Sequence, residues 1–210
     1  MLPQTENLSK DVITIQHPLD GFSYVVDNDK HTFVPASLYQ EKKKAQYLNI
    51  LGFDDAKSVV CTDFISIIKA YNVYLVSEND YEILNNLPEK AEFRHASSVL
   101  IEDLIKQNSE RTDDTRVYLN IKDQRFEMIV IKEDNLLFDN TFRFKTKEDF
   151  LYFMLFTLEQ LKLEAESVPV YFLGMIEEDS KLVELTSRYI RDVRFLRKEN
   201  NILLNSIKCE

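Results

Sequence analysis

Apolar and polar residues alternate most regularly in the second half of the chain. Apolar side chains occupy every second position of residues 117–121, which is the pattern of a half-buried strand. The pair Asp123-Gln124 interrupts the pattern as a turn, and residues 126–131 form a second strand. Another polar turn at 133–135 leads into a third strand that begins at residues 136–138. The pattern predicts a meander of three antiparallel strands.

The hydrophobic period then changes from two to that of a helix. Thr146 and Asp149 have the spacing of a capping box, and apolar residues follow at helical spacing to about Lys162. The segment Pro169–Leu173 is continuously apolar, as expected for a fully buried strand. Ser180 can cap a second helix whose inward residues are Leu182, Leu185 and Ile190, and Val193–Leu196 is a final strand. The predicted order is β-β-β-α-β-α-β.

The first half gives a less regular pattern. Strands are expected at Val12–Gln16 and Phe22–Val26, joined by an Asp20-Gly21 turn. The segment Phe33-Val34-Pro35 leads into a predicted helix that contains Leu38, Ala45 and Leu48 and is stopped by Gly52. The remaining predictions are a buried strand at Val73–Val76, a helix opened by a Ser77–Asp80 capping box, and a helix over 96–107.

Residues 108–115 carry no apolar side chain and are the clearest candidate for a linker. A chain of 210 residues has room for two small domains, since domains usually contain about 100–150 residues. We therefore predict an N-terminal lobe at residues 1–110 and a C-terminal lobe at residues 111–210. The sequence has 3 glycines, each isolated, so it cannot form a glycine-rich loop.

The chain is acidic. With 26 basic and 36 acidic residues, its formal net charge is −10, which excludes binding to a phosphate backbone over most of its surface. Five of the basic residues form one run, and if that stretch is helical, its spacing of three places the first members on neighbouring turns. The run is either a solvated helix edge or a docking site for an acidic partner; its members are Arg188, Arg191, Arg194, Arg197 and Lys198.

The residue types that bind metals or carry out nucleophilic catalysis are few and scattered. Cys61 lies in an apolar stretch and is predicted to be a small buried hydrophobe, while Cys209 belongs to the C-terminal tail. The histidines His17, His31 and His95 share no metal-ligand spacing with other residues, and we interpret the first and last of them as structural. The sequence lacks a signal peptide pattern and a stretch long enough to span a bilayer, which predicts a cytoplasmic protein without membrane insertion.

Several segments resemble an uncharacterised bacterial family of unknown function to which an actin-like ATPase fold is assigned. The specific part covers 136–196, and 20–23, 33–35 and His95 match more weakly. The resemblance implies an α/β fold of two ribonuclease-H-like lobes. The family would have a further strand-helix-strand stretch after the first hairpin, but only four residues separate Val26 from His31, so the first lobe is either abbreviated or lacks a piece. The specific segments are Leu137–Phe142, Lys145–Tyr152, Glu159–Leu161, Pro169-Val170, Gly174, Asp179-Ser180 and Tyr189-Ile190.

The same resemblance indicates where a nucleotide would bind in an actin-like ATPase. Two Asp-x-Gly turns would face the phosphates, and a glycine pair would leave room for the adenosine, because glycine lets the backbone approach a ligand closely. Here the first turn has Asp20-Gly21 without a spacer, the second has Asp123-Gln124 without glycine, and the adenosine position is Gly174 followed by Met175. All three subsites therefore depart from what ATP binding requires.

We interpret Asp20 and Asp123 as turn residues, and Glu177-Glu178-Asp179 as acids that complement a helix N-terminus. A metal role for Asp20 and magnesium binding by the acidic triplet stay open. The sequence thus assigns no catalytic, cofactor-binding or metal-binding residue and implies no cofactor. The favoured hypothesis is a non-catalytic scaffold whose partner is another protein, with no binding to nucleic acid. The alternative is an ATP-binding, actin-like ATPase with a divergent site between the lobes.

Overall fold

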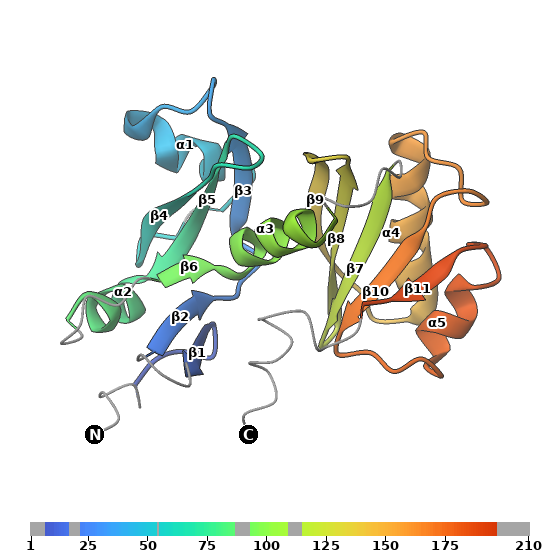
Figure 1. The fold of residues 1–210 in the computed structure, drawn as a ribbon. Helices are drawn as coiled ribbons and strands as arrows, with labels where there is room; N and C mark the ends of the chain where they lie inside the picture. Colours follow the sequence, from blue (N-terminus) through green and yellow to red (C-terminus); the bar gives the residue numbers. More distant parts are fainter. Residues whose placement is uncertain (1–6, 17–21, 54, 87–92, 109–114, 197–210) are drawn as a thin grey trace. The chain divides into compact units, whose positions relative to one another are not determined.

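The computed structural model of the protein describes residues 7–16, 22–53, 55–86, 93–108 and 115–196 (Figure 1). These residues belong to two compact units, one ending at Leu104 and the other beginning at Ile105. The predicted linker lies largely outside the described residues, as do Cys209, His17 and the Asp20-Gly21 turn. Among the described residues, no helix combines the length and the apolar character that crossing a bilayer requires.

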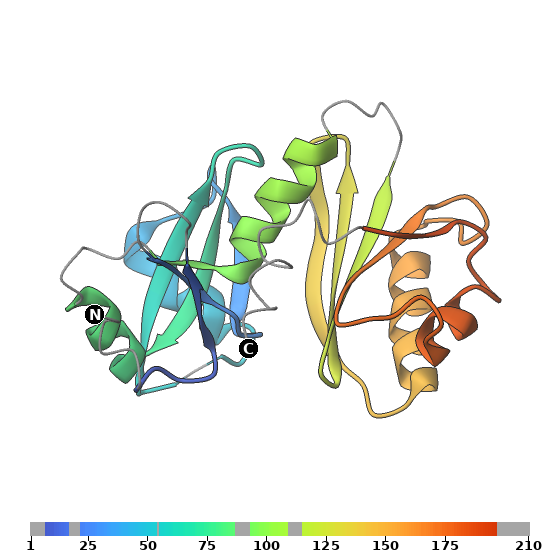
Figure 2. The same ribbon diagram turned by 60° about the horizontal axis from the view of Figure 1, so that its bottom comes forward.

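The C-terminal unit has the predicted order of elements. Its five-stranded sheet has the strand order β11-β10-β7-β8-β9, in which β7, β8 and β9 are antiparallel and β10 is parallel to both β7 and β11. Helices α4 and α5 lie on the same face of this sheet (Figures 1 and 2). The elements are β7 (Arg116–Lys122), β8 (Arg125–Lys132), β9 (Asn135–Arg143), α4 (Lys147–Gln160), β10 (Val170–Gly174), α5 (Lys181–Thr186) and β11 (Val193–Phe195).

The core of this unit lies between the sheet and α4. Phe150, Met154 and Leu158 recur every four residues along the helix, so they share one face and are all buried. They pack against the alternate residues of the strands that the sequence pattern places inward, such as Val117 and Phe126. Burial of each large apolar side chain contributes about 1.5–3 kcal/mol, so this face holds the helix on the sheet.

Side-chain caps fix where both helices of the C-terminal unit begin. The Thr146 side chain accepts the Asp149 amide and the Asp149 carboxylate accepts the Thr146 amide, which confirms the predicted capping box. The α4 helix ends at Gln160, slightly before the predicted end, and Lys162 follows in the left-handed region with φ 56°. Ser180 caps α5 as predicted, but this helix ends at Thr186, so the buried Ile190 lies beyond it.

The N-terminal unit contains two three-stranded sheets. One has the order β1-β2-β6 and the other β3-β5-β4. Helix α1 packs on the second sheet against β3 and β5 (Figure 1). The elements are β1 (Val12–Gln16), β2 (Phe22–Val26), β3 (His31–Pro35), the 3-10 helix η1 (Glu41–Lys43), α1 (Lys44–Asn49), β4 (Ser58–Ile65), β5 (Ala70–Ser77), α2 (Glu78–Asn85), β6 (Phe93–His95) and α3 (Ala96–Asn108), of which residues 105–108 belong to the other unit.

The N-terminal half departs from the predictions at one helix, at three strands and at one capping box. The predicted helix containing Leu38 begins only at Lys44, because the amides of Leu38 and Tyr39 both bond to the Pro35 carbonyl and close a turn. Strands β3, β4 and β6 were not predicted, since none of them shows a clear alternation of apolar and polar residues in the sequence. Ser77 caps α2 as predicted, but the capping box is not reciprocal. The Asp80 carboxylate accepts hydrogen bonds from the Ser77 hydroxyl and from the Ser9 amide and hydroxyl, the last two at 2.8 and 2.7 Å, which adds a tertiary contact to the cap.

Candidate functional site

The C-terminal sheet carries polar side chains on the face away from α4. Because strand side chains alternate, Asn120 lies opposite to the core residues Leu119 and Ile121. In the antiparallel register Asn120 pairs with Glu127, and Ile129 on β8 pairs with Asp139 on β9. Glu127 and Asp139 are therefore diagonal neighbours on adjacent strands, a separation that side chains of this length bridge.

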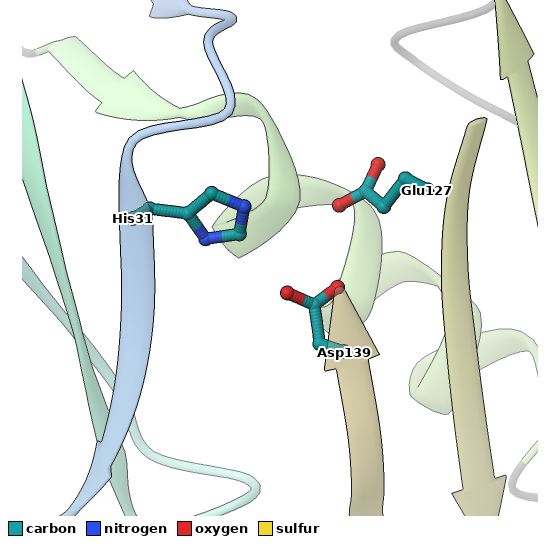
Figure 3. Close-up of side chains that lie close together, drawn as sticks. All are labelled: His31, Glu127 and Asp139. Atoms are coloured by element: carbon teal, nitrogen blue, oxygen red, sulfur yellow. The ribbon is translucent and has the colours of Figure 1, made fainter. Parts of the chain in front are cut away.

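Glu127 and Asp139 form a carboxyl pair (Figure 3). Asn120 Nδ2 donates to Glu127 Oε2 at 3.0 Å, and Lys122 Nζ lies 3.8 Å from the same oxygen. The pKa of Asp139 is raised well above its ordinary value, first by burial, then by the negative charge of Glu127 and a hydrogen bond to it. Lys122 opposes this shift. Asp139 therefore keeps its proton at pH values where an exposed carboxylic acid has lost it.

The chemistry available to this pair is proton binding. Asp139 is protonated and Glu127 is a carboxylate, which is contacted by the Asn120 amide and the Lys122 ammonium. The negative charge of the pair is therefore balanced by its own neighbours. A zinc ion needs more protein ligands than two carboxylates, whereas a magnesium ion can bind through one or two carboxylates and several waters. Within the C-terminal unit, the described residues bring no third His, Cys, Asp or Glu ligand atom to the pair. Within this unit the pair therefore has too few ligands for a zinc site.

The predicted turn at Asp123-Gln124 is confirmed as the loop between β7 and β8, since Lys122 pairs with Arg125. Both loop side chains are exposed. Gln124 has φ 50°, in the left-handed region that glycine adopts most readily, and its carbonyl accepts the Phe144 amide at 3.1 Å. A side chain thus occupies the position at which a phosphate-binding turn would use glycine.

Gly174 ends β10 where this strand passes very close to β7. Its φ is 86°, and an added Cβ would lie 2.3 Å from the Ile121 carbonyl oxygen and 2.6 Å from Asn120 Oδ1. The next amide, of Met175, donates to the Ile121 carbonyl at 2.7 Å, while the Met175 side chain is exposed. The glycine is therefore required by the approach of β7, which fills the space that a side chain would need.

The histidines of the N-terminal unit make structural contacts. His95 Nδ1 accepts the Ser97 amide at 3.2 Å, which caps the start of α3, and its Nε2 lies 3.2 Å from the Asn28 carbonyl oxygen. His95 is thus a neutral imidazole that carries its proton on Nε2. His31, on β3, has its ring centroid 4.3 Å from that of His95 and its Nε2 3.4 Å from Ser97 Oγ.

Asp63, which sequence reasoning missed, anchors the strand that leads to His95. Its carboxylate accepts the Tyr74 hydroxyl at 2.9 Å and the His95 amide at 2.8 Å. Burial raises the pKa of Asp63, while hydrogen bonds from Ser98, His95 and Tyr74 oppose the shift. Burial also raises the pKa of Tyr74 far above its ordinary value. No local motif marks this network, because its members come from β4, β5, β6 and α3.

The basic run is not helical, contrary to the spacing argument, because α5 ends at Thr186. Arg188 forms an ion pair with Glu184, and Arg194, on β11, pairs with Asp192 and donates to the Tyr171 hydroxyl. Arg197 and Lys198 lie outside the described residues. The run therefore does not form one continuous basic surface on a helix.

Cys61 and the acidic triplet complete the residues singled out by sequence. Cys61 is half-buried on β4, and burial raises the pKa of its thiol to about 12. The three acids, 177–179, are exposed in the loop before α5, where the Glu177 carbonyl accepts the Ser180 amide at 3.1 Å. These contacts place the triplet at the start of a helix, as predicted.

A protein family described as "Protein of unknown function (DUF3822)" matches residues 4–193. A solved structure from Bacteroides thetaiotaomicron, described as a protein with an actin-like ATPase fold and unknown function, is 19% identical with a TM-score of 0.79. The match covers 89% of this chain and 72% of that one and shows the actin-like fold. A PilM-PilN type IV pilus biogenesis complex matches with a TM-score of 0.45 and 9% identity, over 80% of this chain and 65% of that one. No curated protein matches the chain.

Proposed function

Because the chain belongs to the DUF3822 family, whose function is unknown, we propose a function from its own residues: a non-catalytic scaffold that binds another protein. The proposal has two parts. The actin-like fold is retained, and two of the places where a nucleotide would need bare backbone, at Gly174 and at the Asp123-Gln124 loop, are filled. The first part rests on the structural likeness, and the second on contacts of the C-terminal unit.

The observation that carries the proposal is the packing of Gly174 against β7. An actin-like nucleotide site would use glycine at this position to leave room for the adenosine. Here a Cβ added at residue 174 would lie within 3.0 Å of atoms of Ile121 and Asn120, so these two residues leave no room for a side chain. The small residue therefore serves contact between two strands, and this accounts for the glycine without a ligand.

The β7–β8 hairpin supports the same proposal. A turn that grips phosphate offers several backbone N–H groups to the oxygens, and a glycine lets them come close. The Asp123-Gln124 loop carries an acid and a long amide side chain, both exposed. The acid would repel a phosphate, and the few remaining hydrogen bonds of about 0.5–1.5 kcal/mol each would not offset that cost.

The test is thermal unfolding of the full chain with and without magnesium-ATP or magnesium-ADP. A nucleotide present at a hundred times its dissociation constant would add about 2.7 kcal/mol to the unfolding free energy. For a chain of this size that is a rise in melting temperature of at least about 5 °C. Magnesium without nucleotide is the control for ionic effects, and phosphate release from ATP is measured on the same samples.

We expect no nucleotide-dependent shift and no phosphate release above the protein-free rate. A shift of several degrees with either nucleotide, relative to magnesium alone, would favour a divergent nucleotide site and overturn the scaffold proposal. This outcome does not depend on knowing the protein partner, because it tests the nucleotide site directly.

A further inference from the structure

Three large aliphatic side chains flank α1 of the N-terminal unit without entering its core. Ile50 is 81% exposed, Leu38 65% and Leu51 52%, whereas Leu48 is fully buried with Val34. Single exposed apolar residues are common, but three of this size close to one short helix form a group that needs an explanation. We call this group, together with the adjoining tyrosines Tyr39 and Tyr47 and lysines Lys42 and Lys43, the α1 surface.

Aromatic rings hold this surface together. Tyr39 stacks on Tyr71 with ring centroids 3.8 Å apart, and its centroid lies 6.1 Å from that of Tyr47. The Tyr47 hydroxyl donates to the Leu38 carbonyl at 3.0 Å and accepts the Gln40 amide at 3.0 Å. These bonds fix the segment before η1 against α1. A surface that is already ordered loses little conformational entropy when a partner binds.

The charge of the surface is opposite to that of the chain. Lys44 forms an ion pair with Glu41 at 2.8 Å, and the Tyr39 hydroxyl donates to the same carboxylate, so Glu41 is satisfied within the surface. Lys42 and Lys43 are exposed, and no acidic side chain among the described residues pairs with them. A chain with net charge −10 therefore presents an excess of positive charge here.

We propose that the α1 surface binds an acidic peptide segment of a partner protein that carries apolar side chains. The proposal rests on the scaffold function and names the chemistry of its partner. Leu38, Ile50 and Leu51 would pack against the partner's apolar residues, and Lys42 and Lys43 would face its carboxylates. The rest of the acidic chain would repel such a segment and favour binding at this surface.

Two other ligand classes fit the surface less well. Single-stranded nucleic acids stack their bases on open aromatic faces, but Tyr39 and Tyr71 cover each other at 3.8 Å. A membrane-surface helix presents a long apolar face, whereas α1 has six residues. An acidic peptide uses both the aliphatic side chains and the lysines.

The test is selection of binding sequences from a random twelve-residue peptide library displayed on phage, with the full-chain protein as bait. We expect the enriched peptides to carry net negative charge together with Leu, Ile, Phe or Trp. Synthetic versions of the enriched peptides are then titrated by fluorescence anisotropy. Ile50→Ser with Leu51→Ser should weaken binding about tenfold or more, because both substitutions remove an aliphatic side chain that would be buried against the partner.

The Lys42→Glu and Lys43→Glu double variant should weaken binding about tenfold at low salt and less at 0.5 M salt, where charges are screened. The matched control is Tyr152→Ser, which removes an exposed aromatic side chain from α4 in the other unit and should leave binding unchanged. Circular dichroism melting curves establish that each variant is folded, which is expected because every changed side chain is exposed.

The proposal is overturned if the enriched peptides are neutral or basic, or if the α1-surface variants bind them as well as the original protein. It is also overturned if those variants instead abolish binding to vesicles of phosphatidylserine and phosphatidylcholine or to a single-stranded oligonucleotide. A nucleotide-induced rise in melting temperature would contradict the scaffold function alone, so the two failures are distinguishable.

Discussion

Replacing Gly174 by alanine tests whether the close approach of β10 to β7 is what requires glycine. The φ of 86° costs an alanine about 1–2 kcal/mol, as for left-handed backbone in general. The new Cβ would also lie 2.3 Å from the Ile121 carbonyl oxygen, and forced overpacking of this kind costs about a further 1–3 kcal/mol. Gly174→Ala should therefore lower the unfolding free energy by about 2–5 kcal/mol.

Gly52→Ala is the matched control. Gly52 has φ 78° and no atom within 4 Å of an added Cβ, so the substitution should cost only the backbone part, about 1–2 kcal/mol. The difference between the two variants isolates the steric contact at Gly174. Because the two glycines lie in different units, amide hydrogen exchange of the full chain gives the opening free energy of each unit separately.

The reasoning fails if Gly174→Ala destabilises its unit no more than Gly52→Ala destabilises the other. That result would mean that β7 moves aside at little cost. The explanation of the glycine by strand packing would then be lost, and with it the observation that carries the proposed function. A large difference in the ligand-free protein is what strand packing alone predicts.

Three further predictions concern the carboxyl pair, a helix cap and a buried thiol. The pKa of Asp139 is raised in the folded protein. The contribution of this carboxyl to the unfolding free energy is therefore fully present at pH values below its ordinary pKa of 3.8, and it is lost as the pH rises through the folded pKa. Asp139→Asn, which mimics the protonated acid, should abolish this loss, so urea unfolding should favour the variant increasingly as the pH rises above about 4. Thr146→Ala should cost about 1 kcal/mol in the same assay, and an unchanged midpoint would contradict the capping role. The raised pKa of Cys61, about 12, should make its alkylation by iodoacetamide about a thousandfold slower than that of an exposed cysteine. Mass spectrometry measures both alkylation rates, and equal rates would contradict this prediction.

The C-terminal unit could be predicted in detail because its information is local. Residues 117–121 of β7 alternate between apolar and more polar side chains, and β8 is a largely apolar run between two polar turns. Each of the two helices begins at a side-chain cap that the sequence displays at fixed spacing. In the N-terminal unit, Leu38 seemed to continue the spacing of α1. A bond between the Tyr47 hydroxyl and the Leu38 carbonyl, together with the turn at Pro35, holds it outside the helix instead.

The polar groups were missed because they depend on register between strands. Glu127 and Asp139 meet only in the pairing of β8 with β9, which includes a shift between Val130 and Ile131 that no local pattern displays. Asp63 similarly reaches the His95 amide from a strand 32 residues earlier. Gly174 was identified from sequence as a position of interest, but the contact that requires it became visible only once β7 and β10 were paired.

The scarcity of glycine leaves ordinary residues in left-handed backbone at several turns. Lys69, Gln124, Glu133 and Lys162 have φ values between 49° and 56°. An L-residue gives up about 1 kcal/mol or more in that conformation, which glycine would not. Substituting glycine at these turns should therefore raise the unfolding free energy. The gains at well-separated turns should add nearly independently. A variant stabilised in this way would keep the α1 surface unchanged for binding experiments, because none of the four turns belongs to it.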